Sequence, residues 1–239
     1  MPILSLHSVS RSFGALKVTD RVSFDLEPGE ALGIIGPNGA GKSTLFNLIT
    51  GNISADAGRI ILDGRDVTGL PPMDRVRAGI GRSFQIPQPF GGLSVYENLL
   101  VAARFGGEVG AAEAPRFCMD ILARTGLSAV AEKTASGLPL LQRKRLELAR
   151  AMATKPRVIL LDEIAGGLTD AECVELVATI RSIHAEGTAI IWIEHVLHAL
   201  NSVVERLMVL NFGRMLMIGA PDAVMASPEV KEIYLGIEA

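Results

Sequence analysis

The sequence predicts an α/β fold with a mixed sheet at its core, an N-terminal antiparallel β layer and an inserted helical subdomain. Three short apolar segments are typical of buried parallel strands: residues 31–35, residues 158–163, which end in two acids, and residues 189–193. Residues 1–30 and 58–67 alternate apolar and polar side chains around turn residues, as an antiparallel sheet does. Between about 87 and 137 apolar residues recur at three- and four-residue intervals, which indicates helices.

A glycine-rich loop follows the first apolar run. Residues 36–44 (GPNGAGKST) fit the phosphate-loop pattern G-x-x-x-x-G-K-[ST], and residues 43–50 continue with helical composition. The backbone N–H groups of such a loop and the positive end of the helix dipole wrap a pyrophosphate. We expect Lys42 to reach the β and γ phosphates and Ser43 to ligate Mg²⁺. The expected nucleotide-binding residues here are Gly36, Pro37, Asn38, Gly39, Ala40, Gly41, Lys42, Ser43 and Thr44.

The middle of the chain predicts the helical subdomain. Residues 95–105 and 114–125 have helical periodicity, and residues 106–110 (GGEVG) punctuate them as a loop. We therefore expect one domain over 1–239, with a nucleotide-binding core at 1–86 and 138–239 and a helical subdomain at 87–137.

The second half of the chain supplies two adjacent acids. Residues 158–163 (VILLDE) form an apolar strand that ends in Asp162 and Glu163. Neighbouring side chains on a strand point to opposite sides, so one carboxylate can meet a metal while the other meets a water. We expect Asp162 to hold Mg²⁺ and Glu163 to polarise the water that attacks the γ phosphate. A helix N-cap pair is the alternative interpretation.

Two further polar residues are candidates for the site. His195 follows the run at 189–193, at the sheet edge where parallel-sheet proteins bind ligands, so we expect it to contact the γ phosphate rather than to be a structural histidine. Gln85 ends residues 81–85 (GRSFQ), where an amide can meet both Mg²⁺ and the attacking water; an ordinary polar loop residue is the alternative. The expected catalytic residues are Glu163, His195, Gln85 and Lys42, and the expected metal ligands are Ser43, Gln85 and Asp162.

Taken in this order, the motifs resemble the ATP-binding subunit of an ABC transporter, over essentially the whole chain. The resemblance implies a P-loop NTPase of ABC ATPase type that uses ATP and Mg²⁺. It implies that Phe13 stacks on adenine, that Gln85 is the Q-loop glutamine and that His195 is the switch histidine. Residues 12–14, 97–102 and 219–236 are similar to the branched-chain amino-acid importer subgroup.

One motif departs from the family. Its usual signature loop, L-S-G-G-Q, caps the ATP held by a second subunit, and the matching residues here are Leu138, Pro139, Leu140, Leu141 and Gln142. Pro139 has neither a hydroxyl nor an N–H, and Leu140 and Leu141 add bulk where glycines allow close approach. Because a homodimer would carry this altered loop at both ATP sites, we expect a heterodimer with a second ATP-binding subunit; a homodimer is the alternative.

Composition limits the partners and the compartment. The net charge of −3 offers no basic surface for nucleic acid, and two distant cysteines, Cys118 and Cys173, predict free thiols. No stretch approaches the roughly twenty apolar residues that span a bilayer. We therefore expect a cytoplasmic protein, peripheral on the inner face of the cell membrane. The resemblance implies membrane-spanning permease subunits as direct partners and a solute-binding protein as an indirect one.

The function expected is ATP hydrolysis that energises an importer of branched-chain amino acids or related small solutes. A P-loop kinase would carry the same phosphate loop but has no reason to place Glu163 beside Asp162. A soluble ABC-type ATPase of DNA repair or ribosomes usually has tandem units or a coiled-coil insertion, and neither is seen here. A regulatory subunit with weak hydrolysis is suggested by Pro139 and opposed by Glu163 and His195.

Overall fold

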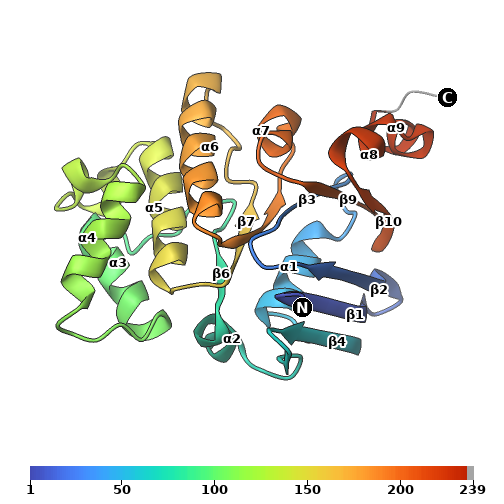
Figure 1. Ribbon diagram of the computed structural model, residues 1–239, viewed down its shortest axis with the longest axis horizontal. Coiled ribbons are helices and arrows are strands. Elements are labelled where there is room, and N and C mark those ends of the chain that lie inside the picture. The colour runs from blue at the N-terminus through green and yellow to red at the C-terminus, as the bar shows by residue number, and fades with distance from the viewer. Residues whose placement is uncertain (236–239) are drawn as a thin grey trace.

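The computed structural model describes residues 1–235, whose strands form two sheets (Figure 1). The larger sheet has six strands in the order β10-β9-β3-β8-β7-β6. Neighbouring strands in it are parallel except for the β9–β10 pair, so the predicted mixed sheet is confirmed. Its members are β3 (Ala31–Ile35), β6 (Ile80–Arg82), β7 (Val158–Asp162), β8 (Ala189–Ile193), β9 (Arg206–Asn211) and β10 (Arg214–Gly219).

The central strands of this sheet are buried on both faces. Every residue of β3, β7 and β8 is buried, which explains why these strands read as continuous apolar runs. Alternate residues of β7 enter different cores: Ile159 and Leu161 pack with the helices, whereas Val158 and Leu160 pack toward the second sheet. The six-stranded sheet therefore separates two hydrophobic cores.

The second sheet is the predicted antiparallel layer. Its four strands lie in the order β2-β1-β4-β5 and pair antiparallel throughout. They are β1 (Leu4–Phe13), β2 (Leu16–Leu26), β4 (Ala57–Leu62) and β5 (Arg65–Asp66). Leu4, Leu6 and Ile60 pack from this layer into the same core as Ile34 of β3.

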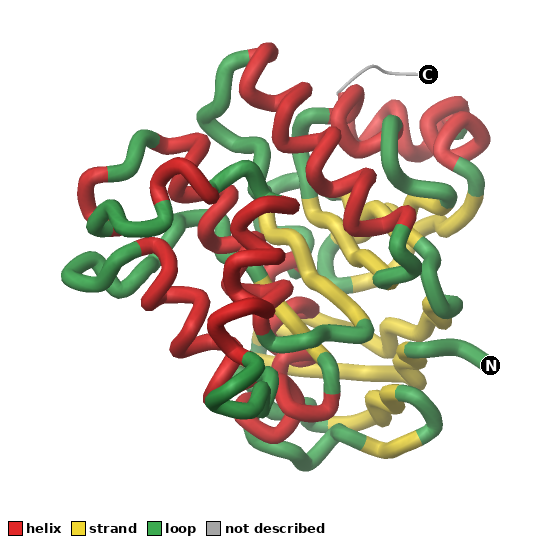
Figure 2. Tube along the Cα trace, turned by 60° about the vertical axis from the view of Figure 1, so that its left-hand side comes forward, coloured by secondary structure: helices red, strands yellow, loops and turns green. Residues whose placement is uncertain are grey.

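Most helices cover the side of the larger sheet that faces away from this layer, whereas the helix after the phosphate loop packs into the core between the two sheets. Figure 2 shows helices and strands gathered largely on different sides. The α-helices are α1 (Lys42–Thr50), α2 (Pro72–Ala78), α3 (Val95–Val101), α4 (Ala114–Arg124), α5 (Leu140–Ala153), α6 (Asp170–Ala185), α7 (Leu197–Asn201), α8 (Pro221–Ala226) and α9 (Pro228–Leu235). A π-helical turn, Ala102–Gly106, extends α3. Among residues 1–235, no helix combines the length and the apolar character that crossing a membrane requires.

Two predicted boundaries differ from the structure. The strand predicted to include Glu163 ends at Asp162, because Glu163 adopts a left-handed backbone with φ of 45°. The helix after the signature loop, which the sequence predicts over 143–153, begins at Leu140, so residues 140–142 form its first turn. Proline has the fixed φ and the missing N–H that a helix start tolerates, and Pro139 is the N-cap. The predicted division at 87 and 137 stays a prediction; α5 contacts α3 and α4 as well as β6 and β7.

Candidate active site

The phosphate loop runs from the end of β3 to the start of α1 and is held tightly on both sides. Gly36 and Gly41 have φ angles of 156° and 100°. A Cβ atom at Gly36 would lie 2.2 Å from the carbonyl oxygen of Leu210, and one at Gly41 would lie 2.4 Å from that of Val18. Larger residues at either position would therefore displace the backbone of a neighbouring strand.

Lys42 opens α1 and turns its ammonium group back into the loop. Its Nζ donates to the carbonyl oxygens of Gly36 at 2.7 Å and Pro37 at 3.1 Å. Burial lowers the pKa of Lys42, while the negative charges of Glu163 and Asp162 raise it. The next residue, Ser43, is exposed on the first turn of α1. The loop therefore places a cation and a hydroxyl beside its backbone N–H groups.

Asp162 lies at the carboxyl end of β7 and is paired with an arginine that the sequence did not indicate. Arg82 Nη2 donates to Asp162 Oδ2 at 2.7 Å, and both side chains are less than a tenth exposed. Arg82 Nη1 donates to Asn47 Oδ1 on α1 at 2.6 Å. The ion pair therefore joins the end of β6, the end of β7 and the helix that follows the phosphate loop.

Three polar residues predicted to act together are brought into contact by three neighbouring strands. Gln85 follows β6, Glu163 follows β7 and His195 follows β8. Gln85 Nε2 lies 2.5 Å from Glu163 Oε2, and His195 Nε2 lies 3.2 Å from Glu163 Oε1. Because parallel strands end at one sheet edge, residues 78 and 32 positions from Glu163 in the sequence meet there.

Two buried charged residues, also missed from the sequence, support these loops. Lys144 of α5 donates from Nζ to the carbonyl oxygens of Gln85 at 2.7 Å and Glu163 at 3.2 Å. Glu194, which is 1% exposed, accepts the backbone N–H groups of Ala165 and His195 at 3.0 and 2.9 Å. Neither residue stands out in the sequence, because Lys144 lies between two arginines and Glu194 follows the end of β8, so no local pattern identifies their partners.

The remaining predicted site residues lie outside this group of contacts. Phe13 ends β1, is about half exposed and lies 5.0 Å below the guanidinium of Arg11, measured to the ring centroid. Of the signature residues, Leu138 is buried, Pro139 is the N-cap of α5 and Leu140 is partly exposed. Leu141 and Gln142 continue the first turn.

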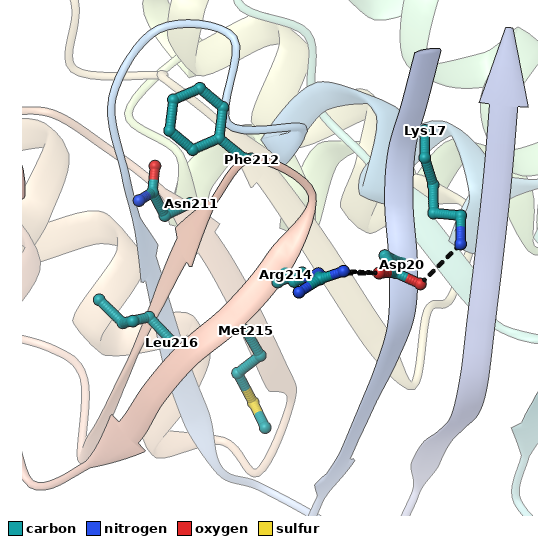
Figure 3. Close-up of a pocket in the computed structure, with 7 residues that line it drawn as sticks. All are labelled: Lys17, Asp20, Asn211, Phe212, Arg214, Met215 and Leu216. Atoms are coloured by element: carbon teal, nitrogen blue, oxygen red, sulfur yellow. Dashed lines mark hydrogen bonds and ion pairs between the residues drawn. The ribbon is translucent and has the colours of Figure 1, made fainter. Parts of the chain in front are cut away.

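A cavity of about 630 Å³ lies beside the hairpin of β9 and β10 (Figure 3). Asp20 is held between Lys17 and Arg214, with distances of 3.1 and 2.8 Å to their nitrogens, and Phe212 stands at the turn. The backbone N–H of Gly213 donates to the carbonyl oxygen of Ala40 at 2.9 Å. The hairpin thus supports the phosphate loop. The residues that line the cavity do not include the predicted catalytic residues.

The donor set suits a hard divalent cation. Hydroxyl, carboxylate and amide oxygens come from Ser43, Asp162 and Gln85, and such oxygens are the ligands that Mg²⁺ prefers. Asp162 accepts from Arg82 through Oδ2, which leaves Oδ1, and Gln85 contacts Glu163 through Nε2, which leaves its amide oxygen. The residues present therefore fit a magnesium ion bound together with nucleotide phosphates.

A phosphate loop, an acidic strand end and a Gln–Glu–His group on a mixed sheet with a second antiparallel sheet define an ABC-type ATPase. Residues 19–166 match the family model described as ABC transporter, and the chain belongs to this family. It is an ATP-binding, ATP-hydrolysing subunit of a transporter.

Relatives of known role match along their whole length. The high-affinity branched-chain amino acid transport ATP-binding protein LivG of Escherichia coli strain K12 is 36% identical, with 98% of each chain covered. The lipopolysaccharide export system ATP-binding protein LptB of Haemophilus influenzae is 30% identical, over 99% of this chain and 98% of LptB. The chain is thus similar to subunits of an amino-acid transporter and of an exporter.

Solved structures agree on the fold. The ADP conformation of MJ1267, an ATP-binding cassette of an ABC transporter, has a TM-score of 0.88 and 31% identity, over 99% of this chain and 100% of that one. The structure of cbiO1 from Clostridium perfringens, part of the ABC transporter complex cbiONQ, has a TM-score of 0.85 and 27% identity, over 98% and 96%. The predicted ABC ATPase fold is therefore confirmed.

Proposed function

We propose that this chain hydrolyses ATP to energise an importer of branched-chain amino acids or related small solutes. The observation that supports the chemistry is the contact of Gln85 and His195 with the two oxygens of Glu163, beside the phosphate loop. The full-length similarity to LivG supports the solute class. The similarity to LptB favours export as the second candidate.

Each residue at the strand ends has a distinct proposed role. The backbone of residues 36–44 wraps the phosphates, and the Lys42 ammonium offsets the charge of the β and γ groups. Glu163 takes a proton from the attacking water, while Gln85 and His195 hold its carboxylate toward the γ phosphate. Magnesium, held by Ser43, Asp162 and Gln85, would supply charge neutralisation of the phosphates. Phe13 stacks on the adenine ring.

The proposed partners are permease subunits that span the membrane, a second ATP-binding subunit and, indirectly, a solute-binding protein. The part that cbiO1 plays in a larger transporter complex supports this assembly. Exposed apolar side chains after Gln85 offer a contact surface: Ile86 and Phe90 are 70% and 47% exposed. The chain then works on the inner face of the cell membrane, bound through these subunits.

Replacing Glu163 with Gln tests the proposed hydrolysis. The amide keeps the shape of the side chain but cannot accept the proton of water, so the hydrolysis rate should fall by about a hundredfold or more. ATP binding should stay within a few-fold of the wild type, since the phosphate loop is untouched. Both quantities are measured on the purified chain with its partner subunits.

Glu175→Gln is the matched control. Its carboxylate lies on α6, pairs with Arg145 at the surface and is not part of the strand-end group, so hydrolysis should be unchanged. A Glu163→Gln protein that hydrolyses ATP at the wild-type rate would contradict the proposed base. Uptake of labelled leucine by vesicles that enclose ATP, with the ATP-binding subunits on the inner face, separates import from export, because an exporter in this orientation accumulates none.

A further inference from the structure

Arg82 is a buried cation in direct contact with the proposed magnesium site. It occupies the last position of β6, the edge strand of the larger sheet beside β7, and its side chain is nevertheless only 8% exposed. Its two terminal nitrogens reach in different directions, to Asp162 Oδ2 at 2.7 Å and Asn47 Oδ1 at 2.6 Å. One guanidinium therefore bridges two elements of the nucleotide site.

Two aromatic rings fix the plane of this guanidinium. Its central carbon lies 5.6 Å from the ring centroid of Phe46 on α1 and 4.9 Å from that of Phe84, which follows β6. Arginine is weakly hydrated and stacks on aromatic faces, so it can stay charged and ordered in this environment. A lysine at the same place would keep the charge but lose the fork that reaches Asn47 and Asp162 together.

The pairing decides how Asp162 is presented. Two effects of the guanidinium oppose each other. Its positive charge repels a divalent cation, which disfavours metal binding. Its hydrogen bond, however, keeps the 7% exposed carboxylate of Asp162 from rotating toward other donors. The arginine contacts only Oδ2, so Oδ1 stays available. Partners that orient a metal ligand commonly change metal affinity about ten- to a hundredfold when they are removed. For Arg82 to favour magnesium binding, this gain in orientation must exceed the repulsion between the guanidinium and the cation.

We propose that Arg82 is a positioning residue for magnesium, which holds Asp162 so that its second oxygen faces the metal that accompanies ATP. This inference rests on the proposed function, because it assumes that Asp162 is a magnesium ligand. It adds a residue of β6, three positions before Gln85, to the machinery of hydrolysis. It also explains why a strand that pairs with β7 in the sheet ends in a charged side chain.

The test separates magnesium binding from nucleotide binding. The dissociation constant of a non-hydrolysable ATP analogue is measured by calorimetry in EDTA and over a series of Mg²⁺ concentrations. For Arg82→Gln we expect a value in EDTA within about twofold of the wild type, because the phosphate loop is intact. The Mg²⁺ concentration that gives half of the magnesium-dependent gain should rise about ten- to a hundredfold. Arg82→Lys should fall between the two proteins.

Arg75→Gln is a matched control for the loss of a buried arginine. Arg75 is 2% exposed and donates to the backbone carbonyl oxygens of Leu48, Ile49, Thr68 and Leu70, away from Asp162. It should lower the melting temperature yet leave the magnesium series unchanged. A merely structural Arg82 would behave in the same way.

Each outcome decides between the claims. If the wild type gains no affinity from Mg²⁺, the proposed function fails before Arg82 is tested. If the wild type gains affinity and Arg82→Gln shows the same or a lower half-saturating Mg²⁺ concentration, the positioning role is wrong. Should Arg82→Gln fail to fold, Arg82→Lys and Asn47→Ala carry the test, and both must raise the half-saturating concentration at least severalfold. Unchanged values for these two variants would also overturn the inference.

Discussion

Glu163 is held in place by its backbone as much as by its side-chain partners. Its φ of 45° is uncommon for a residue with a long side chain, and its N–H donates to the carbonyl oxygen of Ile193 at 2.8 Å. The left-handed conformation takes the carboxylate out of the alternation of β7 and toward Gln85 and His195. Strained residues of this kind persist only where their surroundings over-determine them, as Lys144 does here by binding the Glu163 carbonyl oxygen.

Glu147 on α5 shows a different effect of burial. Burial raises its pKa, while Arg150 and the backbone N–H of Gln88 lower it. Because the raised pKa means that the folded chain binds this proton more tightly than the unfolded chain, its contribution to stability is largest at low pH. That contribution is lost as the pH rises through the folded-state pKa. Neutralising the carboxylate therefore relieves the cost of burying it.

We expect this linkage to appear when the wild type is compared with Glu147→Gln. The free energy of unfolding of the wild type, minus that of the variant, should shift in favour of the wild type as the pH falls from about 8 to about 5. Urea denaturation of both proteins at each pH measures the difference, and all other titrating groups cancel. A difference that does not change with pH would contradict the raised pKa.

At the residue scale, the sequence identifies side chains that belong to motifs. It does not identify residues whose role depends on a contact formed only in the folded chain. Glu163 and His195 follow recognisable apolar strands, so their meeting at one sheet edge could be anticipated, whereas the short strand β6 before Gln85 has no such pattern. Arg82 lies 80 positions before Asp162 and Lys144 lies 59 positions after Gln85. No local pattern encodes such a pair, because each depends on how strands β6 and β7 and helix α5 are placed in space.

At the scale of elements, the segment 86–90 (IPQPF) is a rigid loop rather than a solvated turn. Helix α5 binds it at Gln88: the N–H of Gln88 donates to Glu147 at 2.8 Å, and Arg150 donates to the Gln88 carbonyl oxygen at 2.9 Å. Asn98 of α3 bonds the N–H and the carbonyl oxygen of Phe90 at 2.8 and 3.1 Å. The loop thus presents apolar side chains from a fixed backbone, which suits a docking surface.

Phe90→Asp should weaken the association with membrane subunits and leave ATP binding intact. Replacing an aromatic contact by a charge at an interface costs about 2 kcal/mol or more, so the recovery of permease subunits by co-purification should fall about tenfold or more. Val174→Asp on α6 is the control, since Val174 is 65% exposed and belongs to another surface. Equal recovery of permease subunits with Phe90→Asp and with the wild type would exclude this loop as the contact.

Element boundaries show where sequence patterns are least informative. The buried strands β3 and β8 begin and end as predicted, because their apolar runs stop at polar or glycine residues. The predicted start of α5 at residue 143 is three residues too late, because the pattern of the signature loop covers the first turn of a helix whose N-cap is Pro139. The start of α6 is fixed by a local signal instead: Thr169 is its N-cap and forms a capping box with Glu172.

At the scale of the whole molecule, the altered signature loop determines what kind of dimer is expected. Pro139 offers no side-chain hydrogen bond at the N-cap of α5, so only the free N–H groups of the first turn face outward. A lost hydrogen bond to a charged phosphate costs about 1.5–3 kcal/mol, which is about a ten- to hundredfold loss in affinity. A homodimer would suffer this loss twice.

We therefore expect the purified chain to hydrolyse ATP slowly alone and much faster with a second subunit that carries the usual signature. Most hydrolysis would then occur at the site that contains Glu163 of this chain. Restoring the loop with Pro139→Ser, Leu140→Gly and Leu141→Gly should raise the activity of the chain alone by about tenfold or more. High activity without a partner, and no gain from the restored loop, would show that the helix N-terminus is sufficient to cap ATP.

The sequence patterns predict which kinds of element make up the fold, but they do not predict how these elements are arranged relative to one another. Two kinds of sheet and a helical insert follow from patterns of period 2 and 3.6. The strand order, which places β3 between β8 and β9, and the position of α5 against both sheet and helices depend on long-range packing. Those placements decide which side chains meet.

Helix α5 carries the altered loop at its first turn and holds the segment 86–90 through Glu147 and Arg150 in its second half. A helix of 14 residues is about 21 Å long and stiff, so a force that tilts one end also moves the other end. In the proposed assembly, the permease would press on one end and the neighbouring subunit's nucleotide on the other. The contact with the permease and the contact with the neighbouring subunit's nucleotide would then move together. Neither contact could change during the transport cycle without the other.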